Sequence, residues 1–273
     1  MGPRTGWGAA WQEHAHAVSF DPQRSYAWWR RTRENFNEFR LFEDHWRELN
    51  GRSLVDIGCA TGDLFRWLQD RHPEFRYHGY DVSLPAIAQA KEKYPEGEFA
   101  VVDAELSDLG LSEPPSVLWS RDVVFHQADP LGFLGRLLQI PSEALVLRLR
   151  TRDHGETVGD PEMSRQWHQG HWVPYIVHNF DELIDVVYGM APAAKIWAVK
   201  SYRRLVSTAN LVLPEECASP ETGTADTAMY ISLTGGLAGA RELVVSARQD
   251  FPSPSVWMRR LRALARRVRS RGR

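Results

Sequence analysis

Over most of the chain, the spacing of hydrophobic positions changes repeatedly between that of a buried strand and that of a helix. Between residues 51 and 190, short apolar runs typical of buried strands are followed by stretches with helical spacing. Strands are predicted at 53–58, 75–82, 97–106, 115–123 and 143–151, and helices at 63–72, 84–94, 131–140 and 179–190. This alternation predicts βαβ units, and therefore an α/β fold with a doubly wound, mostly parallel sheet.

The pattern changes toward both ends of the chain. Residues 20–50 have apolar side chains at near-helical spacing, which predicts an N-terminal helical cap over 1–50 that packs over the site as a lid. After the last helix, strands are predicted at 194–205, 227–233 and 241–248, and the last two are expected to pair as an antiparallel hairpin at the edge of a seven-stranded sheet. The main domain is predicted to span 51–250, with an exposed insertion at 212–228.

Composition and charge narrow the class of protein. Hydrophobic residues make up 43% of the chain, and its first residues lack the charged-then-apolar pattern of a secretory signal, so a cytoplasmic protein is expected. Two cysteines, Cys59 and Cys217, are too few for a disulfide framework or a cysteine-based zinc site.

The net charge of −2 hides an uneven distribution. The last sixteen residues hold eight arginines and no acidic residue, while the other 257 residues carry 25 basic and 35 acidic side chains. An acidic body argues against a general nucleic-acid binder. The segment 251–273 is predicted to form a basic amphipathic helix that could bind an anionic membrane surface or a partner subunit.

The stretch LVDIGCATGDL, residues 54–64, places a tight glycine loop between a buried strand and a helix. Asp63 occupies the position of the third glycine in a dinucleotide-binding fingerprint, where an acid would oppose a pyrophosphate at the helix N-terminus. A phosphate loop of the Walker type is excluded because no Gly-Lys-Ser/Thr follows. Asp56, at the end of the strand, suits a cationic amino group better than a phosphate.

This stretch resembles motif I of the class I S-adenosylmethionine-dependent methyltransferases, and three more segments resemble the following motifs in register. The resemblance covers residues 50–150 and implies S-adenosylmethionine as the cofactor. An acidic rim also suits a sulfonium and an ammonium better than an anionic dinucleotide. The implied cofactor residues are Asp56, Gly58, Ala60 and Gly62 of the loop, Asp81 and Val82 at the ribose, Asp103 and Ala104 at the adenine, and Asp122 after the fourth strand.

Methyl transfer to an aliphatic hydroxyl needs a base, whereas a phenol, a carboxylate or an amine needs less help. His126 follows the fourth strand at the mouth of the cofactor site and is the first candidate for this base. His171 is the second candidate. It lies in RQWHQGHWVPYIVHNF, residues 165–180, part of the predicted substrate segment 152–180.

The aromatic residues of that segment suit an acceptor pocket, with Trp172 and Tyr175 as its walls and Trp29 of the cap as a further candidate. A zinc site is not expected, because Gly170 and Pro174 prevent the helix that would bring His168 and His171 together. Residues 173–187 also resemble a group of bacterial methyltransferases from polysaccharide and sugar-derivative pathways.

The predicted function is therefore O-methylation of a small polar acceptor such as a sugar, a polysaccharide precursor or a natural product. The alternatives are an N- or C-methyltransferase without a base, an RNA-modifying methyltransferase recruited by the arginine-rich tail, and a cofactor-binding scaffold without activity. Binding of RNA through the tail would weaken steeply with salt.

Overall fold

The computed structural model describes residues 26, 29–30, 35–160, 162–168, 171–205, 207–218, 222–234 and 240–248. The basic tail 251–273 and the first 25 residues of the predicted cap lie outside this part of the chain. None of the helices in the described ranges is both long and apolar enough to cross a membrane.

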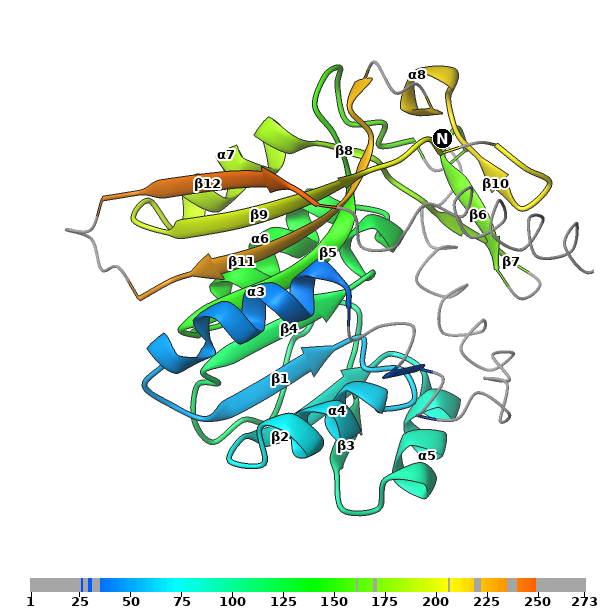
Figure 1. Ribbon diagram of the computed structural model, residues 1–273. Helices are drawn as coiled ribbons and strands as arrows, with labels where there is room; N and C mark the ends of the chain where they lie inside the picture. Colours follow the sequence, from blue (N-terminus) through cyan, green and yellow to red (C-terminus); the bar gives the residue numbers. More distant parts are fainter. Residues whose placement is uncertain are drawn as a thin grey trace, which may run out of the picture.

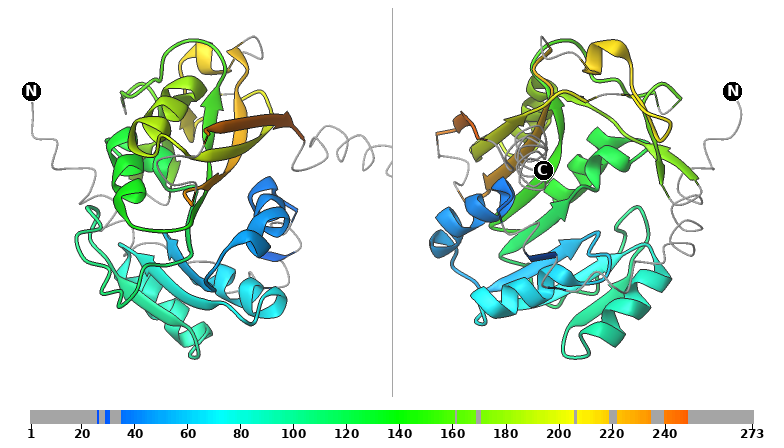
Figure 2. Two further views of the ribbon diagram at one scale, coloured as in Figure 1. Left: turned by 90° about the vertical axis from the view of Figure 1, so that its left-hand side faces the viewer. Right: turned by 45° about the vertical axis from the view of Figure 1, so that its right-hand side comes forward.

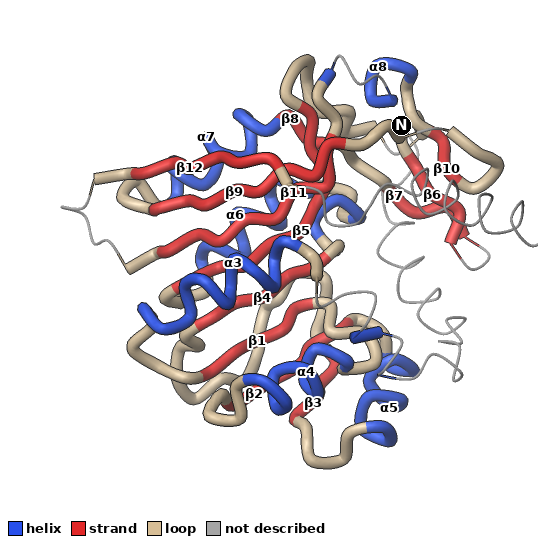
Figure 3. Tube along the Cα trace, in the orientation of Figure 1, coloured by secondary structure: helices blue, strands red, loops and turns tan. Residues whose placement is uncertain are grey.

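A large mixed sheet forms the centre of the molecule (Figures 1 and 3). Over the described residues it has nine strands in the order β12-β9-β11-β5-β4-β1-β2-β3, with β8 paired to β5. These strands are β1 (Ser53–Ile57), β2 (Arg76–Asp81), β3 (Glu98–Val101), β4 (Val117–Arg121), β5 (Ala144–Arg152), β8 (His178–Asn179), β9 (Lys195–Tyr202), β11 (Ala225–Ser232) and β12 (Glu242–Ala247).

Helices cover both faces of the sheet, because β1, β2, β4 and β5 each bury apolar side chains on two sides. Apolar residues of α3, α4 and α5 belong to one core cluster and those of α6 and α7 to the other, and Figure 2 shows the two layers from the side. The helical elements are α3 (Asn37–His45), η1 (Trp46–Glu48), α4 (Asp63–Arg71), α5 (Leu84–Lys93), η2 (Val124–His126), α6 (Pro130–Gln139), α7 (Phe180–Met190) and α8 (Glu215–Ala218).

A second, three-stranded sheet follows the first five strands in sequence. It consists of β6 (Arg165–His168), β7 (His171–Pro174) and β10 (Leu211–Val212), all antiparallel. Backbone hydrogen bonds attach the segment after β7 to the loop after β4, since the Ile176 amide donates to the Phe125 carbonyl at 2.8 Å. The region predicted to bind substrate therefore lies beside the carboxyl end of β4 (Figure 1).

The doubly wound, mostly parallel α/β fold is confirmed, but two details of the predicted sheet are wrong. The sheet has nine described strands rather than seven. The antiparallel edge hairpin is also absent from the described residues: β11 lies between β5 and β9 and pairs antiparallel with both, and β12 pairs in parallel with β9. A strand has only two edges, so β11 cannot pair with β12 as well.

The predicted exposed insertion at 212–228 is exposed only in part. Glu215 and Glu216 are exposed, but Cys217 of the same short helix is fully buried. Residues 225–228 form the first half of β11 and are buried. Asp226, one of the polar residues of this segment, forms buried ion pairs and is not in contact with solvent to any large extent.

Candidate functional site

The glycine loop between β1 and α4 adopts backbone conformations that restrict its residues. Gly58 and Gly62 have φ angles of 83° and 78°, and a Cβ on Gly58 would lie 2.3 Å from a methyl carbon of Val123. Ala60 also has a positive φ, 51°, at the position where the related motif carries glycine or alanine. The loop is therefore held tightly against the sheet at the carboxyl end of β1.

Asp81 fixes the loop from the neighbouring strand. One carboxylate oxygen accepts a hydrogen bond from the Ala60 amide and the other from the Ser83 amide, both at 2.9 Å. Each carboxylate oxygen has a second lone pair, so the side chain can accept from further donors such as two ribose hydroxyls. Val82 is partly buried beside it. Asp81 therefore retains capacity to accept hydrogen bonds beyond those of the loop.

Asp56 lies near the carboxyl end of β1, the strand next to β2 in the sheet. It is buried, and its carboxylate accepts a hydrogen bond from the Tyr77 hydroxyl at 2.8 Å. Burial raises the pKa of Asp56 to about 7, an effect that the charge of Asp81 increases and that Tyr77 and Arg121 oppose. A cationic group placed against this carboxyl would favour its ionised form.

Asp103 and Ala104 follow β3, the next strand of the sheet. Asp103 is exposed, and the backbone amide of Ser107 donates to its carboxylate at 3.0 Å. Hydrogen bonds from Ser107 hold the pKa of Asp103 below its ordinary value. Carboxylates thus occur at the carboxyl ends of β1, β2 and β3, which are adjacent in the sheet. These three carboxylates fit a cofactor that carries positive charge.

His126 lies in η2, directly after β4, and packs against Phe125 and Tyr175. Its Nδ1 is 2.6 Å from the carbonyl oxygen of Pro174. A carbonyl oxygen only accepts, so Nδ1 carries the proton in the neutral ring and Nε2 carries the lone pair. The structure therefore sets the tautomer in which Nε2 is the basic nitrogen.

Of the other residues predicted to surround the acceptor, Tyr175 contacts the His126 ring, whereas Trp172 and Trp29 pack against other aromatic residues. Tyr175 is buried, and its hydroxyl accepts from Arg150 Nε at 2.8 Å. Trp172 faces Trp167 across the β6–β7 pair. Trp29 packs edge-on against Phe39 of α3. His171 belongs to β7, but its side chain lies outside the described residues.

A buried ion-pair network lies at the carboxyl ends of β4 and β5, and the sequence predictions missed it. Asp122 has a positive φ of 60°, and its carboxylate meets Arg148 at 2.5 Å, Arg150 at 3.3 Å and Arg121 at 3.3 Å. Asp122, predicted to touch the cofactor, is therefore part of this network.

Two more carboxylates complete the network. Glu38 of α3, fully buried, pairs with Arg121 at 2.7 Å, and Asp226 of β11 pairs with Arg150 at 2.7 Å and with Arg203 at 2.9 Å. Attraction to Asp122, Glu38 and Asp226 outweighs burial and raises the pKa of Arg148. The network joins α3, β4, β5 and β11 beside His126.

Comparison with known proteins finds a family match over part of the chain. Residues 55–139 match the model of a methyltransferase domain. A curated trans-aconitate 2-methyltransferase from Acidovorax sp. (strain JS42) is 23% identical over 171 residues, which cover 59% of this chain and 65% of that protein's length. The chain thus spans just under two thirds of that relative.

Solved structures of low identity share the fold. An O-methyltransferase from a trans-AT PKS multienzyme of Brevibacillus brevis, in complex with S-adenosyl-L-homocysteine, superposes with a TM-score of 0.52 at 11% identity and covers 72% of this chain and 71% of that one. Magnesium protoporphyrin IX methyltransferase from Synechocystis PCC 6803 superposes with a TM-score of 0.50 at 13% identity and covers 82% and 96%. The methyltransferase domain match over residues 55–139, together with the four motifs, supports a class I S-adenosylmethionine-dependent methyltransferase.

Proposed function

We propose that this chain methylates an oxygen atom of a small polar acceptor, with His126 as the base that takes the acceptor's proton. The observation that carries the proposal is the hydrogen bond from His126 Nδ1 to the Pro174 carbonyl, which leaves the lone pair on Nε2. Bound S-adenosylmethionine supplies an electrophilic methyl group. Asp81, Val82, Asp103 and Ala104 would hold its nucleoside, and Asp56 its amino group.

The reaction needs alignment of the acceptor as well as a base. η2 brings His126 to the carboxyl end of β4, the strand next to β1 and its glycine loop. Ring contacts with Phe125 and Tyr175 and the bond to Pro174 restrict rotation of the imidazole. His126 can therefore hold one orientation toward an acceptor beside the cofactor loop.

Replacement of His126 by alanine is expected to lower turnover with a hydroxyl acceptor about 10²-fold, because general-base catalysis is lost. Release of S-adenosylhomocysteine would be measured with a panel of monosaccharides and, separately, with trans-aconitate. His171→Ala is the matched comparison for the second histidine of the acceptor region. Normal turnover of His126→Ala with a sugar that the unaltered enzyme methylates would contradict the base assignment.

A second candidate acceptor is a carboxylate, which needs no base. The network beside His126 sets four guanidinium groups against three carboxylates among the described residues, so its formal charge is +1. Curated relatives are named for trans-aconitate, an acid. Methylation of trans-aconitate at equal rates by the unaltered chain and by His126→Ala would favour this candidate over a hydroxyl acceptor.

The raised pKa of Asp56 predicts that cofactor binding depends on pH. The ammonium of S-adenosylhomocysteine attracts the ionised carboxylate, so affinity should rise as the pH rises through about 7 and fall by up to about tenfold per pH unit below it. Calorimetric titrations between about pH 5.5 and pH 8 would measure this change.

Tyr77→Phe gives a matched variant for this experiment. It removes the hydroxyl that stabilises the Asp56 carboxylate, so the pKa of Asp56 should rise further and the loss of affinity should begin at a higher pH. An affinity that stays constant over this range in the unaltered chain would contradict the role given to Asp56.

A further inference from the structure

The outermost strand of the sheet, β12, presents an apolar edge. It is the last strand of the order and pairs through one edge with β9, from Glu242 opposite Lys195 to Ala247 opposite Lys200. Leu243, Val244 and Val245 are 42%, 41% and 45% exposed. A strand edge of this kind can add another strand, and monomeric proteins commonly protect such edges with lysine, proline or a bulge. The sequence ELVVSA contains neither lysine nor proline.

Two backbone hydrogen bonds show which backbone groups of β12 point outward. The amide of Glu242 donates to Ala194 and that of Arg248 to Lys200, so the even-numbered residues of the strand bond toward β9. Backbone groups alternate in direction along a strand. The amides and carbonyls of Leu243, Val245 and Ala247 therefore point away from the sheet.

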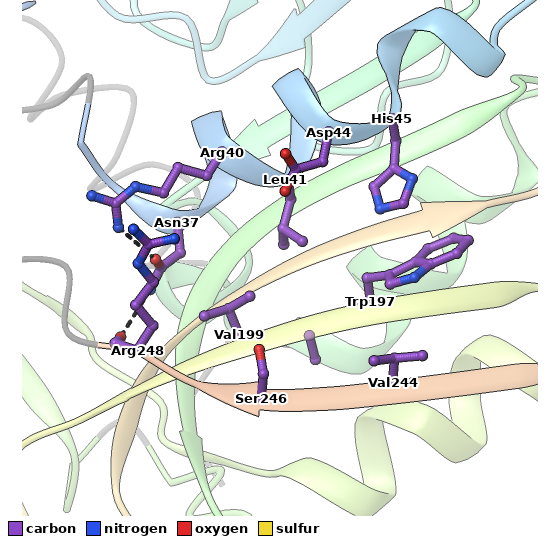
Figure 4. Close-up of a pocket in the computed structure, with 11 residues that line it drawn as sticks. Asn37, Arg40, Leu41, Asp44, His45, Trp197, Val199, Val244, Ser246 and Arg248 are labelled. Atoms are coloured by element: carbon purple, nitrogen blue, oxygen red, sulfur yellow. Dashed lines mark hydrogen bonds between the residues drawn. The ribbon is translucent and has the colours of Figure 1, made fainter.

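The charged residues at the two ends of β12 lie on one face of the sheet. Figure 4 shows Val244, Ser246 and Arg248 directed toward α3, where they line a groove of about 240 Å³. Glu242 shares this face because side chains alternate with a period of two. Within the described part of the chain, no ion pair is formed by Glu242 or Arg248.

We propose that β12 pairs antiparallel with β12 of a second copy of this chain, across a two-fold axis at Val245. In this register Glu242 lies opposite Arg248 of the partner subunit, and the symmetric pair repeats the contact. Leu243 lies opposite Ala247 of the partner subunit, and Val245 lies opposite its own copy. The outward amides and carbonyls of Val245 then bond to each other as a hydrogen-bonded pair.

The backbone directions allow few other registers. Outward residues must oppose outward residues, so the strands can shift only by steps that keep odd-numbered residues opposite one another. A shift that centres the axis on Ser246 would place Arg248 opposite Val244 of the partner subunit, so its charge would meet no opposite charge. A register with the two-fold axis at Val244 places Glu242 opposite Ser246 of the partner subunit, which carries no charge. Of these three registers, only the one centred on Val245 pairs opposite charges, and this self-complementarity identifies a second copy as the occupant.

The test is the mass of the full chain in solution, measured by light scattering after size-exclusion chromatography at several protein concentrations. The unaltered chain is expected to be a dimer. Glu242→Arg and Arg248→Glu should each weaken dimerisation about tenfold or more, because each variant turns two attractive pairs into two repulsive ones. The double variant should restore the dimer.

Glu113→Arg is the matched control, since it makes the same charge change at an exposed site on another part of the surface. Binding of S-adenosylhomocysteine reports that each variant is folded, because the glycine loop lies near the opposite edge of the sheet from β12. A monomer at every concentration would overturn the proposal. A dimer that the single variants do not weaken, or that the double variant does not restore, would overturn it as well.

Discussion

Replacement of Asp81 by alanine is expected to weaken binding of S-adenosylhomocysteine at least about 100-fold. The carboxylate would lose charge-assisted hydrogen bonds to two ribose hydroxyls, each about 1.5–3 kcal/mol. The same change removes the acceptor of the Ala60 amide at 2.9 Å and so loosens the glycine loop. Calorimetric titration of the variant beside the unaltered chain measures the effect.

Two further variants separate the charge of Asp81 from its shape. Asp81→Asn keeps the size of the side chain, but its amide nitrogen cannot accept from the backbone amides of Ala60 and Ser83, so binding should fall nearly as far. Asp185→Ala removes an exposed aspartate of α7, on the other face of the sheet, and should leave binding unchanged. Tight binding by Asp81→Asn would show that the carboxylate is not the ribose ligand.

Asp226→Ala is expected to lower the free energy of unfolding by about 3–5 kcal/mol, because removal of one partner leaves buried charges unpaired. Asp226 is buried in β11 and forms ion pairs with Arg148 at 3.3 Å, Arg150 at 2.7 Å and Arg203 at 2.9 Å. Arg148 and Arg150 are themselves buried. Urea unfolding followed by circular dichroism measures the change.

Glu113→Ala provides the comparison on the surface. Its ion pair with Arg76 at 3.4 Å joins two side chains that are both more than 70% exposed, so its loss should change stability by less than about 1 kcal/mol. If Asp226→Ala costs no more than Glu113→Ala, the network does not hold α3, β5 and β11 together in the way described.

The order of the first five strands and their helices followed from the sequence, because hydrophobic periodicity is a local property. Each predicted strand and helix between residues 53 and 152 overlaps an observed one, and the glycine loop lies between β1 and α4 as expected. The pairing of β11 and β12 did not follow, because it depends on which strand edges remain unpaired. That information belongs to the assembled sheet and not to either segment.

The arginine pattern of one strand indicates the buried ion-pair network in the sequence. Arg148, Arg150 and Arg152 alternate with Leu149 and Thr151 in a strand that begins with four apolar residues, which predicts charges on one buried face that require partners. Glu38, one of the carboxylates of the network, could not be identified from such a pattern. Glu38 meets Arg121 across 83 positions of sequence, and only the packing of α3 on the sheet brings the two together.

The β6–β7 pair also had a local signal. Trp167 and Trp172 are equally distant from the centre of Gln169-Gly170, a dipeptide suited to a tight turn, and the structure places the two tryptophans opposite each other. The contact of His126 with Pro174 had no such signal, because it joins two segments 48 positions apart.

The most direct test of the cofactor assignment is a calorimetric titration of the unaltered full chain with S-adenosylhomocysteine and, separately, with NAD⁺. Asp56 and Asp63 on either side of the glycine loop, and Asp81 as the proposed ribose ligand, predict binding of S-adenosylhomocysteine at one site and no binding of the anionic dinucleotide. Absence of S-adenosylhomocysteine binding, or binding of NAD⁺ in its place, would contradict the assignment.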